Sequence, residues 1–296
     1  MIENPILWSW DRIRLAASSI GSAAPDEYWS RQGLGAELPT VRRIETSDLR
    51  DVLARGFADF GAIRTDVIFL CVTYPVIGLV LGRLASGYGM LPLLFPLASG
   101  FALIGPLAAV GLNEMSRRRE RGTETGWMDA FGVLRSPSIG SIVLLGMLLI
   151  AIFLLWLMVA QAIYEVTLGP RPPVSLGAFA HDVFTTAAGW AMIVVGIGAG
   201  FLFAVVVLAI SVVSFPLLLD RDVGMETAMR TSIHAVVANP RPMAMWGLIV
   251  AAGLVIGSIP FFLGLVIVLP VLGHSTWHLY RKVVPPLPGI APAPES

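Results

Sequence analysis

The chain has 296 residues, of which 56% are hydrophobic and 14% are charged, and its formal net charge is zero. Soluble domains carry about 25% charged residues, so this composition excludes a single water-soluble core and predicts that much apolar surface faces lipid. Without a basic excess, nucleic acid is not expected as a partner. The single cysteine, Cys71, excludes an intrachain disulfide framework and a CxxC metal site.

The two ends of the chain differ in composition from the middle. Residues 1–40 form a polar arm with an aromatic start, in which Trp8 and Trp10 precede a short basic stretch. Tryptophan and arginine suit the headgroup zone of a membrane, so the arm is either a short interfacial helix or a disordered tail. Trp8 and Trp10 are candidate partner contacts. Residues 285–296 are proline-rich and are predicted to form a tail without fixed structure.

Six apolar stretches lie between these ends, most of them near the ~20 residues that cross the hydrocarbon of a bilayer. We predict spans over residues 66–84, 91–112, 139–163, 187–216, 243–256 and 260–280. The fourth exceeds one bilayer thickness, and the fifth is short enough that a re-entrant hairpin is an alternative. Residues 164–184 contain three prolines and are predicted to be a structured loop.

An amphipathic helix is predicted before each pair of spans. The first covers residues 47–60, the second is a short apolar stripe from Trp127 to Leu134, and the third lies between Asp222 and Pro240. Asp222 is the expected N-cap of the third helix, and Pro240 ends it because the residue before proline disfavours the α region. Such helices lie in the membrane interface or pack on their own bundle.

Basic residues decide the orientation of the spans. Of the 20 Lys and Arg residues, all except Arg83 and Arg171 fall before span one, between spans two and three, between spans four and five, or after span six. By the positive-inside rule, both termini and all three amphipathic helices are cytoplasmic. The predicted fold is therefore all-α. It is a polytopic membrane domain over residues 41–284 with six transmembrane helices and three cytoplasmic-side amphipathic interfacial helices, arranged as three helix-plus-hairpin units.

Polar residues near the cytoplasmic ends of the spans are the candidate site. His274 and His278 are four residues apart on one helix face, a spacing that can bind a metal or haem or handle protons, although histidines also mark a membrane–water interface. Asp220 and Asp222 either solvate and cap the end of span four or pair with a basic cluster and clamp the repeats together; Asn239 and Pro240 are counted as structural. The basic cluster, a candidate partner surface, is Arg117, Arg118, Arg119 and Arg121.

Two stretches carry a resemblance. FPLLLDRDVGMETAMRTSIHAVVANPRPMAMWGLIV and the later LPVLGHSTWHLYRKVV resemble a family of proteobacterial predicted integral membrane proteins, domain of unknown function 2189. The resemblance covers about residues 41–284. It implies a six-span protein of the bacterial cytoplasmic (inner) membrane, and it implies no activity.

No catalytic motif is found in the sequence, and no cofactor is predicted. The span interiors contain no deep Asp, Glu, Lys or Arg of the kind that secondary transporters use. The first interpretation is a non-enzymatic accessory, scaffold or assembly protein of a larger membrane complex, with the lipid bilayer and a membrane-protein complex as partners. One alternative is a small-solute or lipid transporter or lipid-handling protein, and another is a haem- or metal-binding membrane protein that uses His274 and His278.

Overall fold

The structure is a computed structural model that describes residues 38–62, 83, 91–123, 125–170, 173–260 and 263–286. Several predictions fall on residues outside these ranges, so they stay predictions: the arm with Trp8 and Trp10, the first span with Cys71, most of the proline-rich tail, and Arg171. The described residues contain helices and no strand, in agreement with the predicted all-α class.

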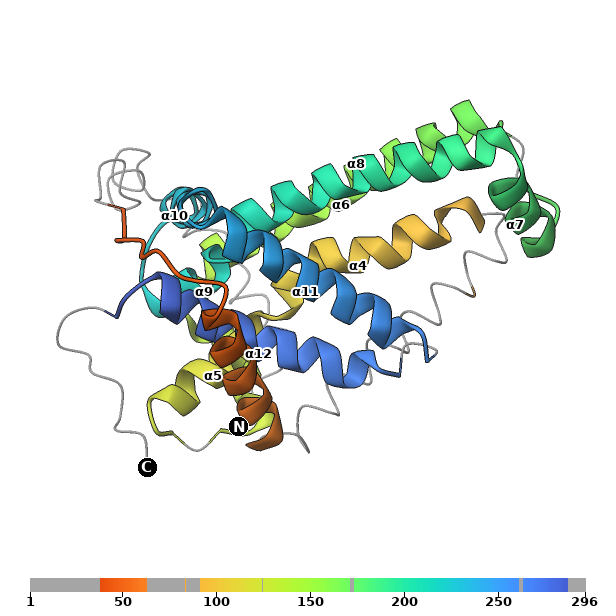
Figure 1. Cartoon of the computed structure of the whole chain (residues 1–296). Coiled ribbons are helices and arrows are strands. Elements are labelled where there is room, and N and C mark those ends of the chain that lie inside the picture. Colours follow the sequence, from red (N-terminus) through yellow and green to blue (C-terminus); the bar gives the residue numbers. More distant parts are fainter. Residues whose placement is uncertain are drawn as a thin grey trace, which may run out of the picture. The chain divides into compact units, whose positions relative to one another are not determined.

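The helices follow one another with short connections. A helix over residues 48–62 precedes η1 (Leu91–Leu93), α4 (Leu94–Ala108), α5 (Val110–Glu120), η2 (Trp127–Arg135), α6 (Ile139–Thr167), α7 (Leu176–Thr185), α8 (Ala187–Ser211), α9 (Ser214–Asp220), α10 (Met225–Ala238), α11 (Pro240–Ser258) and α12 (Leu265–Val283). Figure 1 shows α6 and α8 side by side with α4 along α6; α7 lies at one end of this layer, and α5, α9 and α10 lie at the other.

Four helical stretches among the described residues are long and apolar enough to cross a membrane. They are Phe95–Glu120, Ile139–Thr167, Ala187–Asp220 and Pro240–Ser258, which overlap predicted spans two to five; the first continues past the predicted end at residue 112 as far as Glu120. At 1.5 Å per residue, the 29 residues of α6 extend about 44 Å, more than the ~30 Å of hydrocarbon. Its two ends therefore reach the headgroup zones.

The predicted sixth span behaves differently. α12 begins apolar but ends in HSTWHLYRKV, and it is not among the helices that qualify as candidate spans. The polar half of α12 is buried by other helices, whereas large apolar side chains on α6 and α8 are exposed, including Met147, Met158 and Phe201. A helix that is exposed and apolar faces lipid, and one that is buried and mixed is surrounded by protein.

Two of the candidate spans are interrupted close to a proline. Pro106 lies inside α4, three residues before the break at Ala109, and Pro216 lies in α9, just after the break at Val212–Val213. At the second break, the backbone N–H of Val213 donates to Ser232 Oγ of α10 at 3.2 Å. Each break turns the last part of the span towards the end of the molecule where charged side chains gather.

Three local expectations are corrected. The apolar stripe Trp127–Leu134 forms a 3-10 helix, η2, rather than an α-helix. Residues 164–184 are not only a loop, because α7 forms there with the Ser175 hydroxyl accepting from Ala178 N at 3.1 Å. Asp222 is not the N-cap of α10: Gly224 occupies that position, and the Asp222 carboxylate lies 3.5 Å from Ser138 Oγ.

The close contact between the 48–62 helix and α12 yields a stability test. A methyl group at Gly56 would lie 2.8 Å from the backbone nitrogen of Ser275, whereas Gly61 on the same helix has open space around it. We expect Gly56→Ala to lower stability by about 1–3 kcal/mol through overpacking. Gly61→Ala should instead raise it by about 0.5–1 kcal/mol through helix propensity. Thermal unfolding midpoints in mild detergent measure both; equal shifts for the two variants would contradict this packing.

Candidate functional site

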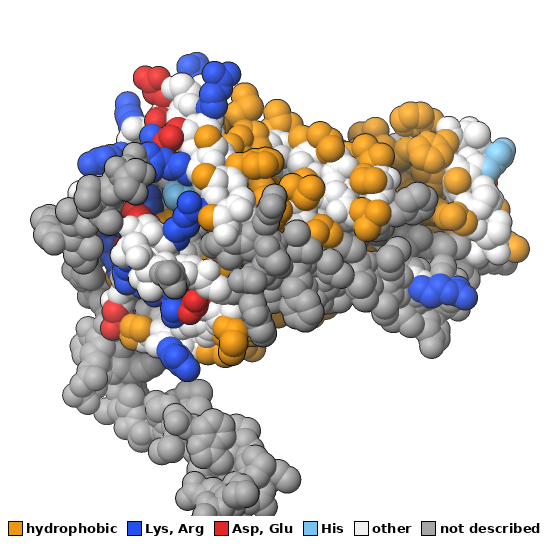
Figure 2. Space-filling view, turned by 90° about the horizontal axis from the view of Figure 1, so that it is seen from below, with side chains coloured by type: hydrophobic (Ala, Val, Ile, Leu, Met, Phe, Trp, Pro, Cys, Tyr) orange, Lys and Arg blue, Asp and Glu red, His pale blue; other side chains and the backbone are white. Residues whose placement is uncertain are grey.

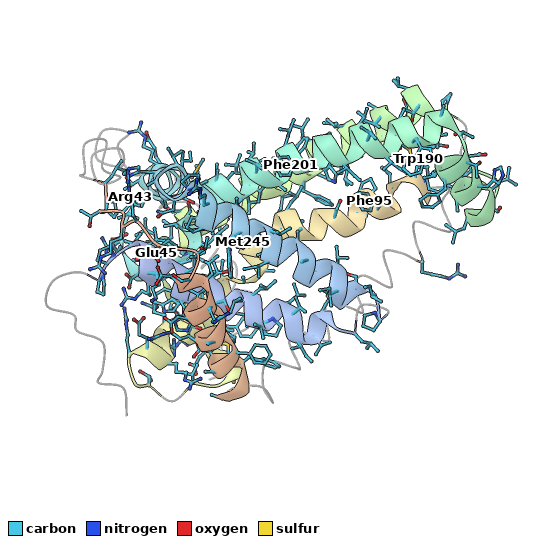
Figure 3. The ribbon with its side chains drawn as sticks, viewed as in Figure 1. Arg43, Glu45, Phe95, Trp190, Phe201 and Met245 are labelled. Atoms are coloured by element: carbon cyan, nitrogen blue, oxygen red, sulfur yellow. The ribbon has the colours of Figure 1, made fainter. Side chains whose placement is uncertain are left out.

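Charged side chains gather at one end of the described structure (Figure 2). We call this region the polar end; it is built from the 48–62 helix, α5, η2, α9, α10 and the second half of α12. The amphipathic pattern of α12 explains its central position, because its His, Trp, Tyr and Arg side chains can meet polar groups of several helices around it. Figure 3 labels Arg43 and Glu45 at this end and Trp190 at the opposite end.

A chain of hydrogen bonds connects both candidate histidines through two residues from other helices. His278 Nε2 lies 2.8 Å from Asp59 Oδ2, Ser116 Oγ donates to the same Asp59 oxygen at 2.6 Å, and Ser116 Oγ lies 2.8 Å from His274 Nδ1. A serine hydroxyl has one proton. Because this proton goes to Asp59, Ser116 accepts from His274, which places a proton on Nδ1 of that ring.

Asp59 is the hub of this chain. Its other carboxylate oxygen lies 3.2 Å from Arg119 Nη1, so the side chain accepts from α5 and α12 while it belongs to the 48–62 helix. Burial raises the pKa of Asp59, but the hydrogen bonds and charge of His278, together with the Ser116 hydroxyl, outweigh this effect and hold the pKa below its usual value. Asp59 is thus a buried carboxylate that is ionised and fully partnered.

A second cluster joins α5, α9 and α12. Glu120 accepts from Trp277 Nε1 at 2.9 Å and from Arg281 Nε at 2.9 Å. Asp220 accepts from Tyr280 OH at 2.7 Å and from Arg281 Nη1 at 3.2 Å. The Arg281 guanidinium also lies 5.5 Å from the centre of the Trp277 ring. One arginine therefore joins two carboxylates from two other helices.

The arginine cluster has partners inside the molecule. Arg117 and Arg118 both bind the buried Glu114, at 2.7 and 2.8 Å, and Arg118 also pairs with Asp129 of η2. Arg119 pairs with Asp59 as described, and Arg121 Nη2 lies 3.8 Å from Asp220 Oδ1. Of the expected clamp between the cluster and Asp220 or Asp222, the structure brings together Arg121 and Asp220. The partner-surface role of the four arginines stays a prediction.

Asn239 connects the N-terminal segment of the described structure to the α10–α11 junction. Its amide oxygen accepts from Ile44 N at 2.7 Å, and its amide nitrogen donates to Arg42 O and to Ala235 O, both at 3.0 Å. The side chain is buried and satisfies three backbone groups, which explains why an amide is suited to this position. Pro240 is the first residue of α11, where its missing N–H has no helical partner to lose.

No further side chain among the described residues completes a metal site with His274 and His278. Within the described ranges, no three His, Cys, Asp or Glu side chains form a group that could hold a metal ion. His278 Nε2 is engaged by Asp59 and His274 Nδ1 by Ser116, which leaves His274 Nε2 without a hydrogen-bond partner among the described residues. A single free nitrogen falls short of the three or four protein ligands of a zinc site, and the haem alternative stays a prediction.

Several residues of the polar end were not identified as site residues from the sequence. Asp59, Ser116, Glu120 and Tyr280 have no motif of their own, and their partners are 57 to 219 residues away in the chain. The available signal was weak: polar residues with helical spacing close to an apolar stretch. That signal predicts the depth of a residue relative to the membrane, but it does not predict which residue its side chain contacts.

The comparisons with known proteins agree with the membrane location that the apolar helices indicate. A family model described as "Predicted integral membrane protein (DUF2189)" matches residues 94–220, from α4 to α9. The two stretches that suggested this family lie mostly after the matched region. Neither a curated protein nor a solved structure matches the chain. The chain is an integral membrane protein with several apolar helices, and a lipid bilayer is its environment.

The hub position of Asp59 yields a second prediction. Asp59→Asn keeps the side-chain shape but leaves Arg119 and His278 without a carboxylate, so we expect a loss of about 1–3 kcal/mol of stability. The control is Asp51→Asn on the same helix, because the Asp51 carboxylate is exposed where it meets Arg55 and Lys282. Its removal should cost at most about 1 kcal/mol. Thermal unfolding in detergent compares the two, and equal losses would contradict the hub role.

Proposed function

We propose that the protein is a non-enzymatic accessory, scaffold or assembly protein of a larger membrane complex. The observation that carries this proposal is an exposed apolar ridge on η2 at the polar end. Met128 and Leu134 are 68% and 69% exposed, and Phe131 between them is 52% exposed. A 3-10 helix has 3.0 residues per turn, so residues three and six apart fall on one line.

The ridge is held on a firm base. Asp129 Oδ2 accepts from Gly126 N at 2.9 Å at the start of η2, and its other oxygen pairs with Arg118 of α5. Gly111 lies close to Ala130, where a methyl group would approach the Ala130 backbone oxygen to 3.3 Å. A preorganised apolar surface loses little conformational entropy when a partner covers it. The expected partner is an apolar helix or groove of another membrane protein.

The chemistry of the polar end favours a structural role over an enzymatic one. Its buried carboxylates, arginines and histidines bind one another, as the Asp59 and Glu120 clusters illustrate. Catalytic groups need a reactive atom within reach of a substrate, and Ser116 and His274 are buried. These groups are suited to holding the 48–62 helix, α5 and α12 together.

The proposed setting is the bacterial inner membrane, with both termini and the polar end in the cytoplasm. Its support is the distribution of charge: the described basic residues lie in the polar end or the segments attached to it, except for Arg83, which falls at the far end of the first predicted span. In this orientation η2, α10 and the 48–62 helix are the three cytoplasmic-side interfacial helices, each with exposed apolar residues such as Phe57 and Val237.

The partner surface can be tested by charge substitution. Met128→Glu combined with Leu134→Glu should abolish co-purification of any protein that accompanies the wild-type chain in stoichiometric amount from mild detergent. The reason is that binding would bury two unpaired carboxylates. The measurement is quantitative mass spectrometry of the tagged protein isolated from its own bacterium.

The matched control is Val237→Glu on α10, because Val237 is 71% exposed and also belongs to the polar end. It should leave the partner bound. If Val237→Glu releases the partner as completely as the combined Met128→Glu and Leu134→Glu variant does, the ridge is an interfacial membrane contact rather than a protein-binding surface. If no protein accompanies the wild-type chain, the accessory role is wrong.

The orientation has its own test. With Cys71 replaced by serine, single cysteines at Val174, which is 99% exposed in the α6–α7 connection, and at Glu226 on α10 report on opposite sides. A membrane-impermeant maleimide added to intact spheroplasts should label Val174→Cys at once. Glu226→Cys should react only after permeabilisation, and the reverse pattern would overturn the proposed orientation.

A further inference from the structure

An apolar cavity lies at the end of the molecule opposite the polar end. It has a volume of about 420 Å³ and is lined by residues of η1, α4, α6, α7 and α8. Its walls include Phe95, Trp156, Phe179 and Ile197, and the side-chain polar groups among the described residues that line it are the Tyr164 hydroxyl and the Trp156 indole N–H. This volume falls within the about 300–1,000 Å³ typical of small-molecule pockets. Figure 3 shows Phe95 on α4, below α8.

The sequence of α7 explains how one side of the cavity is formed. Apolar residues recur at helical spacing and all of them line the cavity: Leu176, Phe179, Ala180, Val183 and Phe184. The opposite face carries His181 and Asp182, whose side chains are exposed. Such a helix lies flat across the ends of the spans. α7 is fixed against α8 because Gly189 lets the backbones of Asp182 and Val183 approach closely.

The wall formed by α6 and α8 is rigid and leaves room. Trp156 is buried and its indole N–H donates to Pro96 O of α4 at 3.1 Å. Gly200 accommodates the Trp156 ring, since a methyl group there would lie 3.3 Å from it. Gly196, one turn earlier on α8, has nothing within 4 Å of its missing side chain. The cavity therefore owes part of its volume to a glycine on the wall.

The position and chemistry of the cavity identify what fills it. Three of its walls belong to candidate membrane spans, and Phe95 and Ile197 on these walls are also exposed at the outer surface. Water does not fill an apolar cavity with almost no hydrogen-bonding groups, whereas the hydrocarbon of a surrounding bilayer matches the chemistry of its lining. We propose that this cavity binds an acyl chain of a membrane lipid. This site is independent of the accessory role proposed for the ridge.

The test uses a matched pair of glycines on α8. Gly196 lines the cavity; Gly198 also has open space around it but does not line the cavity. The probe is phosphatidylcholine with a photoactivatable diazirine near the end of one acyl chain, added to proteoliposomes of the full chain. We expect crosslinks on cavity-lining residues such as Ala160 and Phe179 in the wild type, their loss in Gly196→Phe, and their retention in Gly198→Phe.

Several outcomes overturn the proposal. They are crosslinks only on outward-facing residues of α6 and α8, cavity crosslinks that persist in Gly196→Phe, or crosslinks between two copies of the chain at the α7 face. If Gly196→Phe does not fold, Ala160→Leu on the α6 wall takes its place with the same expected loss. Partner co-purification with the Gly196→Phe protein separates this test from the ridge, because the accessory role predicts that the partner stays bound.

Discussion

The cost of placing charge in hydrocarbon governs this molecule. A chain that buries apolar helices in lipid must collect its charged side chains where water or an opposite charge can compensate them. At the polar end, this compensation is largely internal: Asp59, Glu114, Glu120 and Asp220 each accept from groups on other residues, and most of these contacts join different helices. The ion pairs therefore fix which helices meet, while burial of apolar surface supplies the affinity between them.

This constraint divides the molecule into two ends with different physical properties. At the polar end, directional hydrogen bonds specify the arrangement, and a rigid apolar ridge on η2 remains exposed. At the opposite end, α7 and the ends of α4, α6 and α8 are held by apolar packing, and a glycine on the wall leaves a cavity. The first end is suited to a protein partner and the second to hydrocarbon, so the two proposed contacts need not compete.

The sequence was informative where one residue property repeats along the chain. Continuous apolar runs predicted α6, α8 and α11, and helical spacing predicted α10 and the 48–62 helix. It was less informative where the outcome depends on a distant partner. The link between Ser116 and His274 joins residues 158 positions apart, and Asp222 turned to Ser138 instead of capping α10. α7 was missed because the prolines that precede it in the sequence, at 170, 172 and 173, suggested a loop, although 176, 179, 180, 183 and 184 have helical spacing.

α12 shows why counting apolar runs did not settle the number of spans. Its first half is apolar, and its second half carries His274, Trp277, His278, Tyr280 and Arg281 on a helix that would otherwise expose them to lipid. These side chains are tolerated because the 48–62 helix, α5 and α9 surround them and supply Asp59, Glu120 and Asp220. The polar half of α12 therefore depends on these helices for its hydrogen-bond and ion-pair partners. Its pattern encodes a position inside a protein core, which a periodicity argument cannot distinguish from a position at a membrane surface.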